Sequence, residues 1–360
     1  MTGWYLAPLA PFVGFAGMGV AAWFGARLPE RLVSWVTVSG CMAAVPGAWF
    51  AEGWLERSFV VLVGVLGALI GMFSRRYLHR EPGFLRFHLL LCLFVAAAEV
   101  VVVAHDLRQT LVGWEVCGLA SALLIAFFHQ RRGPLDHGLR AFCVYRLCDI
   151  GLVLLVTLPH APAPVAGGLV LLAAIGKSAQ FPLGGWLPRA MEGPTPSSAI
   201  FYGAISVSLG PYLLLHTRPL WDASTLAHAA IITVGVLTAL HATVIARVQT
   251  DIKSALAYAS MTQVALVFIE VGLGWTVLAA VHLAAHAVLR TGQFLRSPSL
   301  LHDHHLLEQD LAGPLPPTGR FFTALPEPAR IHLYRYGIAR GHTDTLPRAI
   351  THLLRKAARR

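Results

Sequence analysis

Two ionisable side chains of opposite charge, Glu115 and Lys177, lie inside stretches of sequence that are otherwise apolar. A lone carboxylate in such surroundings tends to hold a proton, because burial disfavours its charged form, whereas a nearby cation restores the charge. Lys177 is the natural candidate for that cation. A pair balanced in this way changes its protonation state when a third charge moves nearby. We therefore expect Glu115 and Lys177 to form either a proton-transfer site or a static ion pair between two helices.

Three further charges also fall within apolar stretches. Arg146 and Asp149 are three residues apart, and hence neighbours on the surface of one helix. A charge at the centre of a bilayer costs at least ~2.5–3.5 kcal/mol, so such residues usually pair with one another or serve a function. We interpret Arg146 and Asp149 as a local pair that lets the arginine enter the membrane and that can bias Glu115 electrostatically. Glu99 has no obvious partner, and we interpret it as structural.

His282, His286 and Arg290 recur at every fourth residue, which places them in one stripe along a helix. Histidine titrates near neutrality, so two histidines on one face suit a proton relay, with Arg290 as a fixed cation beside them. A structural role at a helix interface is the alternative. The spacing also suits zinc, but residue 283 is Leu instead of the Glu of an HExxH motif, and the same block offers no third ligand.

No other motif indicates a metal, a cofactor or a catalytic group. The cluster His302-Asp303-His304-His305 offers metal ligands, but its polar surroundings favour a solvated loop. The five cysteines form no CxxC pair, so neither a zinc knuckle nor a disulfide framework is indicated. We expect no cofactor or metal in this chain, and no enzyme that acts alone.

The composition places these side chains in a membrane. Of the 360 residues, 56% are hydrophobic and only 13% are charged, about half of the ~25% that soluble domains carry. The formal net charge of +10 suggests nucleic-acid binding at first sight. However, the basic residues gather between apolar blocks and in the C-terminal tail, where they set membrane orientation and suit anionic lipid head groups or an acidic partner. We therefore expect an integral membrane protein that binds lipid and no nucleic acid.

The apolar blocks have lengths near the ~20 residues that cross a hydrocarbon core as a helix. Loop signals such as Pro29, Gly133-Pro134 and Gly193-Pro194 separate them. The sequence therefore predicts an all-α membrane protein of about eleven transmembrane helices, at residues 4–24, 32–50, 58–76, 86–105, 109–129, 138–158, 167–186, 194–216, 224–247, 252–271 and 275–295.

The basic residues in the connections between these spans are distributed unevenly between the two sides of the membrane. Twelve lie in the connections on one side and three in those on the other, which predicts an N-terminus outside and a C-terminus in the cytoplasm. The twelve are Arg27, Arg31, Arg75, Arg76, Arg80, Arg86, Arg131, Arg132, Arg140, Arg189, Arg247 and Lys253, and the three are Arg57, Arg108 and Arg218.

The chain changes character at Pro298, because five further prolines follow before residue 329 and leave no room for a span. Two short basic segments come next, at 327–340 and 345–358. The second gathers its leucines on one helical face, which is typical of a helix that lies on a membrane surface or docks on a partner. A partly disordered, solubilising tail is the alternative. We divide the chain into a transmembrane ion-conducting domain, 1–296, and a basic cytoplasmic tail, 297–360.

Three prolines and a glycine between Trp186 and Pro196 predict irregular backbone near the membrane edge. At membrane depth, such backbone must be buried in protein or line a cavity. A plain turn between two helices is the alternative.

Several long motifs, in order, resemble the antiporter-like, proton-translocating membrane subunits, a family that includes the largest such subunit of respiratory complex I and subunits of multi-subunit sodium/proton antiporters. The resemblance covers roughly residues 55–295. It rests on GWEVCGL (113–119), RLCD (146–149), GKSAQFPLGGWLPRAMEGPTPSSA (176–199), QTDIKSALAYASMTQ (249–263) and HLAAHAVLRTGQFL (282–295).

Within that family, the segment LRTGQFLRSPSLLHD (289–303) is most similar to the membrane subunit of the DAB inorganic-carbon accumulation complex. Relatives in complex I carry a lysine at the position of Arg290. The resemblance implies a soluble, zinc-containing partner similar to β-carbonic anhydrases, and it implies that the pair accumulates bicarbonate using a cation gradient.

The resemblance also implies residue roles. Glu115 and Lys177 match the essential buried glutamate and lysine of the family. Asp251 and Lys253 match its TDIK motif and are expected to modulate or support the site. His282 and His286 match the family's central histidines. The complex I relatives continue beyond the last span seen here, which implies an antiporter-like fold with a truncated second repeat.

We therefore expect a membrane subunit of an energy-coupled inorganic-carbon uptake complex, which conducts protons or sodium ions to drive a soluble partner in a bacterial inner membrane. One alternative is a proton-translocating subunit of a complex I-like pump or a multi-subunit sodium/proton antiporter. The other is a non-conducting membrane anchor for a soluble enzyme.

Overall fold

Helices make up every regular element of the part of the chain that the structure describes, in which no strand occurs. This confirms the all-α prediction. The structure is a computed structural model. It describes the backbone of residues 5–249, 251–310 and 325–343, and the side chains of these residues except 202–204, 298–310 and 342.

A helix, or a broken pair of helices, occupies each predicted span. Six of the described helices are long and apolar enough to cross a membrane, namely α1, α2 with its 3₁₀ extension η2, α3, α4, α10 and α11. The α-helices are α1 (Leu6–Trp23), α2 (Glu30–Ala44), α3 (Trp54–Tyr77), α4 (Phe84–Val103), α5 (Leu107–Ile125), α6 (Arg132–Thr157), α7 (Ala163–Lys177), α8 (Thr195–Ser198), α9 (Leu209–His216), α10 (Thr225–Ala246), α11 (Ile252–Gly272), α12 (Thr276–Asp310) and α13 (Glu327–Ile338); the other elements include 3₁₀ segments η2 (Val45–Phe50), η3 (Gly184–Glu192), η5 (Arg218–Leu220) and η7 (Arg340–His342), and the π-helical turn η4 (Ala199–Ala204).

Local sequence signals explain where several helices begin. Asp106 caps α5 by accepting a hydrogen bond from the Gln109 N–H, and Asp251 caps α11 by accepting one from the Ser254 N–H. A side-chain acceptor of this kind satisfies a backbone donor that the first helical turn leaves free. Gly274, with φ of +80°, turns the chain between α11 and α12 in a conformation that other residues rarely adopt.

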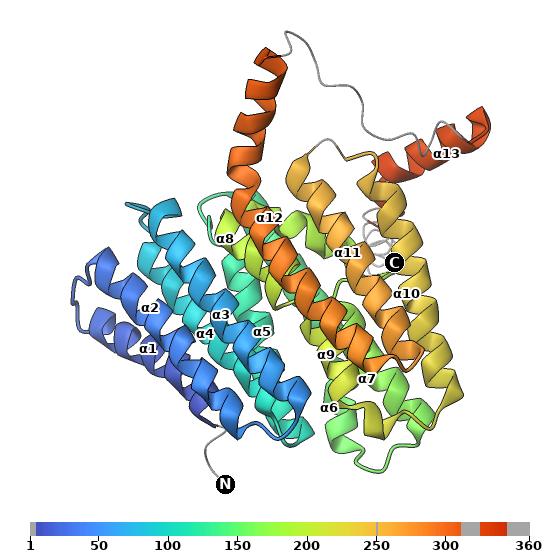
Figure 1. Ribbon diagram of the computed structural model, residues 1–360, viewed down its shortest axis with the longest axis horizontal. Helices are drawn as coiled ribbons and strands as arrows, with labels where there is room; N and C mark the ends of the chain where they lie inside the picture. Colours follow the sequence, from blue (N-terminus) through green and yellow to red (C-terminus); the bar gives the residue numbers. More distant parts are fainter. Residues whose placement is uncertain (1–4, 250, 311–324, 344–360) are drawn as a thin grey trace, which may run out of the picture.

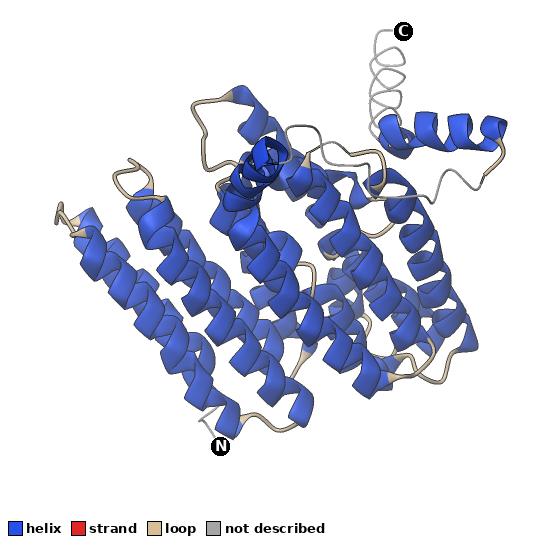
Figure 2. Cartoon of the chain, turned by 45° about the horizontal axis from the view of Figure 1, so that its top comes forward, coloured by secondary structure: helices blue, strands red, loops and turns tan. Residues whose placement is uncertain are grey.

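The helices stand side by side with their connections at two opposite ends, and α1 to α4 form one side of the bundle (Figures 1 and 2). α12 runs obliquely across the bundle and extends beyond the ends of its neighbours (Figure 1). Its 35 residues give a length of ~52 Å, well above the ~30 Å of a hydrocarbon core.

Two predicted spans end at the wrong residue. The last span was predicted to end at 295, but α12 continues through Pro298 to Asp310, because a single proline removes one backbone hydrogen bond without ending the helix here. The seventh was predicted to reach 186, but α7 ends at Lys177. The division into domains at 296/297 stays a prediction, and α12 crosses it.

The segment predicted at 327–340 contains α13, which packs across α10 near one end of the bundle (Figure 1). The Tyr336 hydroxyl lies 2.7 Å from His241 Nδ1 of α10, and burial raises the pKa of Tyr336. A Cβ at Gly337 would collide with Val248. The tail therefore contacts the helical bundle through α13. The segment predicted at 345–358 lies outside the described residues.

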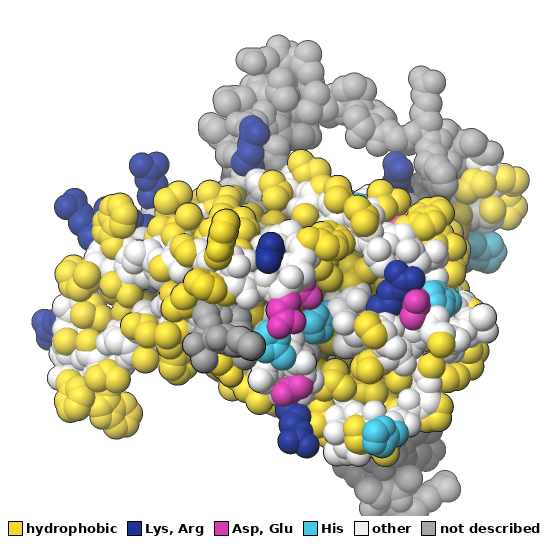
Figure 3. Space-filling model, turned by 60° about the horizontal axis from the view of Figure 1, so that its bottom comes forward, with side chains coloured by type: hydrophobic (Ala, Val, Ile, Leu, Met, Phe, Trp, Pro, Cys, Tyr) yellow, Lys and Arg dark blue, Asp and Glu magenta, His cyan; other side chains and the backbone are white. Residues whose placement is uncertain are grey.

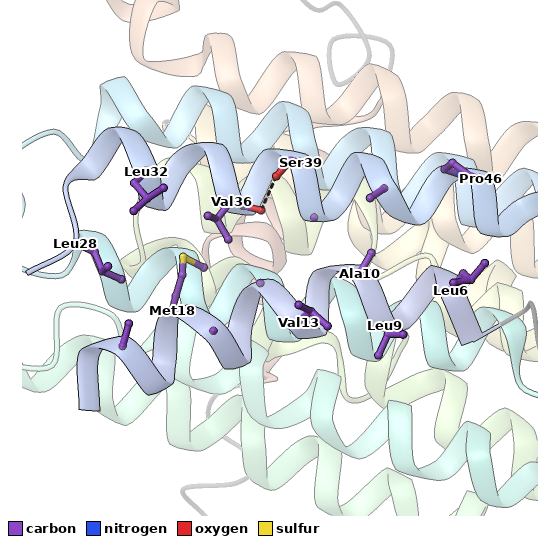
Figure 4. Close-up of a pocket in the computed structure, with 15 residues that line it drawn as sticks. Leu6, Leu9, Ala10, Val13, Met18, Leu28, Leu32, Val36, Ser39 and Pro46 are labelled. Atoms are coloured by element: carbon purple, nitrogen blue, oxygen red, sulfur yellow. Dashed lines mark hydrogen bonds between the residues drawn. The ribbon is translucent and has the colours of Figure 1, made fainter. Parts of the chain in front are cut away.

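The outer surface of the bundle is apolar. Trp23 and Trp49 are each 86% exposed, and a groove of about 680 Å³ between α1 and α2 is lined almost wholly by aliphatic side chains (Figure 4). Large exposed apolar areas are unfavourable in water, so this surface fits contact with acyl chains.

Close packing of α6 against α7 requires a glycine. A Cβ at Gly151 would meet the backbone carbonyl oxygen of Leu169, whereas a Cβ at Gly168 would meet nothing. Gly151→Ala should therefore lower the free energy of unfolding by about 1–3 kcal/mol, the usual cost of overpacking. Thermal unfolding of the purified protein in detergent measures the change.

Gly168→Ala, also within a helix, is the matched control. It should be neutral or stabilising by up to ~1 kcal/mol, since alanine favours helix over glycine. Equal stability of the two variants would contradict the close approach of α6 and α7.

Candidate proton-transfer site

Arg146 lies between two acids. Its guanidinium group forms an ion pair with Glu115 of α5 and a second, at 2.7 Å, with Asp149 on its own helix, α6. The predicted pair between Arg146 and Asp149 is therefore present. The prediction that Lys177 directly partners Glu115 is wrong, because Arg146 occupies that place. The forked donors of a guanidinium can serve two carboxylates at once, which an ammonium does less well.

Asp149 is buried and has a second donor. The indole N–H of Trp114 donates a hydrogen bond of 2.6 Å to its Oδ1 atom, while Arg146 holds Oδ2. Both carboxylate oxygens are thus satisfied, which a buried charge requires. Trp114 immediately precedes Glu115, so one turn of α5 carries both Glu115 and the hydrogen-bond donor to Asp149.

Lys177, the last residue of α7, is completely buried. Its ammonium donates a hydrogen bond of 3.0 Å to the backbone carbonyl of Trp114, and it lies 4.7 Å from the Trp114 ring centroid and 4.6 Å from that of Tyr145. Aromatic faces stabilise a desolvated cation by up to about 2 kcal/mol. The carboxyl end of α7 adds its negative dipole. The site is therefore built to hold a cation without a directly bonded anion.

A glycine provides the space in which these groups meet. A Cβ at Gly118 would lie 3.1 Å from the Lys177 ammonium and 3.3 Å from a terminal nitrogen of Arg146. Two cations therefore approach the same α5 residue.

His282 of α12 has an acceptor at each ring nitrogen. Nδ1 lies 2.8 Å from Glu270 and Nε2 lies 3.0 Å from Gln263, both on α11. Both ring nitrogens of His282 therefore have a polar partner. Neither Glu270 nor Gln263 was predicted from the sequence as a site residue. Glu270 stands in the apolar run Val267 to Val271, at the predicted end of a span, where an acid is easily assigned to the membrane surface.

His286 is buried, and neither ring nitrogen has a partner among the described residues. Arg290, one turn further, donates to its neighbour Gln293 at 2.7 Å. The structure thus places His282, His286 and Arg290 on one helix face as predicted, without a direct hydrogen bond between the two histidines. A relay along this stripe requires water.

Buried polar atoms without a protein partner occur beside Lys177 and on α12. The hydroxyl of Tyr145, whose ring contacts Lys177, lies near Ser121 and Ser206 without a well-formed hydrogen bond to either, and the π-helical turn η4 that precedes Ser206 packs on α12. Buried polar groups are nearly always hydrogen-bonded, to protein or to ordered water. Unpartnered atoms in this part of the bundle belong to Ser121, Tyr145, Ser206, Ser260 and His286.

The predicted irregular backbone is present between α7 and α9, and it is tied into the protein. The Ser178 hydroxyl donates to the Val207 carbonyl at 2.6 Å, and the Phe181 N–H donates to the Thr238 hydroxyl at 2.9 Å. A cavity of about 620 Å³ adjoins the segment, lined in part by Arg189. The segment therefore lines a cavity and is not a plain turn.

Asp251 and Lys253 lie at the same cavity. Asp251 caps α11, and Lys253 donates a hydrogen bond of 2.9 Å to Thr195 in α8. Asp251 fixes the start of α11 and Lys253 joins α11 to α8, so these contacts are structural. Their influence on ion movement stays a prediction.

No group of three or more potential metal ligands occurs among the side chains that the structure describes. The side chains of the cluster 302–305 lie outside them. Glu99, on α4, takes no part in the Glu115–Lys177 cluster.

Residues 160–313 match the family model described as the transmembrane region of NADH:quinone oxidoreductase and Mrp antiporters. The chain is 36% identical over 279 residues to NADH-quinone oxidoreductase subunit L of Mycobacterium tuberculosis, covering 71% of this chain and 44% of the relative. It is 35% identical over 280 residues to NADH-ubiquinone oxidoreductase chain 5 of Papio hamadryas, covering 73% and 46%. The chain thus spans about half the length of these relatives.

Two solved structures have a similar fold. The Mrp complex from a Dietzia species contains a chain with a TM-score of 0.70 and 27% identity, covering 80% of this chain and 37% of that one. The membrane-bound sulfane sulfur reductase, an archaeal respiratory membrane complex, gives a TM-score of 0.68 at 18% identity, covering 81% and 69%. The fold is therefore that of antiporter-like membrane subunits, as predicted.

Trp114→Phe tests the hydrogen bond to Asp149 while keeping an aromatic face toward Lys177. Because Asp149 is buried, loss of the indole donor should lower the free energy of unfolding by about 1–3 kcal/mol. Thermal unfolding in detergent measures it. Trp23→Phe, at a residue that is 86% exposed, is the control and should have no effect. The assignment fails if both variants are as stable as the parent.

Proposed function

We propose, from the match of residues 160–313 to the transmembrane region of NADH:quinone oxidoreductases and Mrp antiporters, that this chain is an ion-conducting membrane subunit of a multi-subunit complex, and that the ion is the proton. The observation that carries the proposal is the cluster in which the half-buried guanidinium of Arg146 pairs with both Glu115 and Asp149 beside Lys177. Asp149 and Lys177 are buried inside the helical bundle, where charge is costly unless it is paired or functional.

The cluster can work as an electrostatic switch. When Glu115 takes up a proton, Arg146 loses one of its two anions and is held by Asp149 alone. The negative charge of Asp149 then stabilises the Lys177 ammonium less, because Arg146 neutralises it. Lys177 therefore releases its proton inward. When Glu115 loses its proton, Arg146 is drawn back and Lys177 binds a proton again.

The released proton has a route toward α12. Tyr145 contacts Lys177, and the unpartnered hydroxyls of Ser121 and Ser206 beside it suit a file of water molecules. His286 would take up the proton, and His282, held between Glu270 and Gln263, would carry it further. Arg290 would act as a fixed cation at the end of the stripe.

A proton fits this site better than a sodium ion. Sodium is bound by oxygen ligands such as carboxylates, carbonyls and water, as hard cations generally are. The group at the centre of the site is instead a lysine ammonium on a carbonyl oxygen, between two aromatic rings. A second cation placed there would be repelled.

The sequence supports a more specific assignment as a second candidate. The segment 289–303, and an arginine at 290 where complex I relatives carry lysine, resemble the membrane subunit of an inorganic-carbon uptake complex with a soluble, zinc-containing, β-carbonic-anhydrase-like partner. That assignment rests on these residues alone, whereas the relatives reported above support a proton-translocating subunit of a complex I-like pump or an antiporter. Purification of the complex from native membranes distinguishes them by the partner recovered.

Charge placement supports an orientation. Arg131, Arg189 and Lys253 line a single cavity at one end of the bundle, although they come from three separate segments of the chain. Basic residues gather on the cytoplasmic side of membrane proteins. We therefore place this end, with the tail, on the cytoplasmic side of a bacterial inner membrane, and the N-terminus on the outer side.

Glu115→Gln and Lys177→Ala test the conduction proposal in the intact complex reconstituted in vesicles. Each change removes a protonatable group from the switch, so proton flux measured with a pH-sensitive dye should fall by about 100-fold, while assembly is unchanged. Glu81→Gln, in the exposed connection between α3 and α4, is the control and should conduct normally. Full flux in both core variants would refute conduction and favour a non-conducting anchor.

A further inference from the structure

Glu99 is the acid whose surroundings differ most from those of the proposed switch. It lies on α4, its exposed fraction is 0%, and neither carboxylate oxygen has a hydrogen-bond partner among the described residues. Glu115 and Asp149, by contrast, share the guanidinium of Arg146. A carboxylate withdrawn from water without a partner costs several kcal/mol or more, so such a group is stable only as the neutral acid.

The groups that interact with Glu99 supply no positive charge. They are the Cys41 thiol of α2 and the Tyr212 hydroxyl of α9, and Tyr212 also interacts with Glu56 of α3. α1, which packs on the same helix, holds no titratable side chain among its described residues. No hydrogen bond or ion pair to Glu99 occurs among the described side chains, including those of α3 and α5, so no described cation is bonded to its carboxyl group.

A polar pocket opens one helical turn away from Glu99. It has a volume of about 220 Å³, and its lining includes Val103, which follows Glu99 by four residues and hence lies ~6 Å further along the same face of α4. Acidic and histidine side chains gather on this end of the bundle (Figure 3). Those that line the pocket are Glu52, Glu56, His105 and His216.

Tyr212 connects the pocket to the interior. Its ring stacks on His216 with centroids 5.7 Å apart, and its hydroxyl donates a hydrogen bond of 2.7 Å to the Val102 carbonyl on α4. His216 in turn lies 3.4 Å from Glu56. The chain from Glu56 through His216 and Tyr212 thus reaches from the pocket to the helix turn that carries Glu99.

We propose that Glu99 is a second proton-binding site, separate from the Glu115–Lys177 switch and loaded from the pocket lined by Glu52, Glu56, His105 and His216. The proton moves from the pocket to a Glu99 carboxylate oxygen and returns by the same route. No covalent bond other than the O–H bond forms. The site lies in the α1–α4 side of the bundle, so it adds a place for a proton that the switch does not use.

Infrared difference spectroscopy of the protein in lipid bilayers tests the site directly. A protonated carboxyl has a C=O stretching band that a carboxylate lacks. At neutral pH the parent protein should show such a band, which Glu99→Gln removes and Glu115→Gln, the matched control, leaves in place. A spectrum that keeps every protonated-carboxyl band in Glu99→Gln would overturn the proposal.

The route is tested by transfer of the membranes into D₂O. The Glu99 band should shift as its proton exchanges, and Glu56→Gln combined with His216→Gln should slow this exchange by about 100-fold, the usual contribution of a positioned acid–base group. Unchanged exchange would overturn loading from the pocket. These readouts do not depend on flux through the Glu115–Lys177 cluster, so the two proposals fail separately.

A labelling experiment on the parent protein covers the case in which Glu99→Gln does not fold. A hydrophobic carbodiimide reacts with protonated carboxyl groups in apolar surroundings. Mass spectrometry should find the label on Glu99, at a rate that falls as the pH rises. Absence of label on Glu99, with label on other buried acids, would overturn the proposal.

Discussion

The sharing of one half-buried guanidinium by two carboxylates is the constraint on which the rest of this site depends. Arg146 makes both Glu115 and Asp149 tolerable inside the membrane, and it leaves Lys177 without a bonded anion. Each of these charges would be prohibitive alone. Together they form a set in which protonation of one member changes the energy of all the others. That coupling, rather than any single residue, is what suits the cluster to proton transfer.

The broken helices around the cluster follow from the same requirement. Lys177 can present its ammonium to the Trp114 carbonyl because α7 ends there, and the irregular segment that follows is held by side-chain hydrogen bonds such as that from Ser178 to Val207. Backbone that leaves the helical pattern at membrane depth must be satisfied by protein or water. The same irregularity opens the cavity lined by Arg189 and Lys253.

The acidic side chains on the two sides of the bundle have different surroundings. Around Arg146, opposite charges compensate one another and the acids can remain ionised. Neither carboxyl oxygen of Glu99 has a hydrogen-bond partner among the described residues, and a polar pocket begins one turn away. Compensation favours fast exchange between charged states, whereas isolation favours a bound proton. The contrast arises from packing and not from the type of residue.

The sequence by itself determined the all-α membrane fold, the positions of most helices and the stripe of His282, His286 and Arg290. Hydrophobic length, loop signals and intramembrane charges are local properties of the chain. It also gave the local pair of Arg146 with Asp149, three residues apart. Only the tertiary structure decided that Arg146 and not Lys177 pairs with Glu115, that Glu270 and Gln263 hold His282, and that Glu99 lies beneath a polar pocket. Those contacts join helices far apart in the chain, and their pairing depends on how the helices pack, which no local pattern specifies.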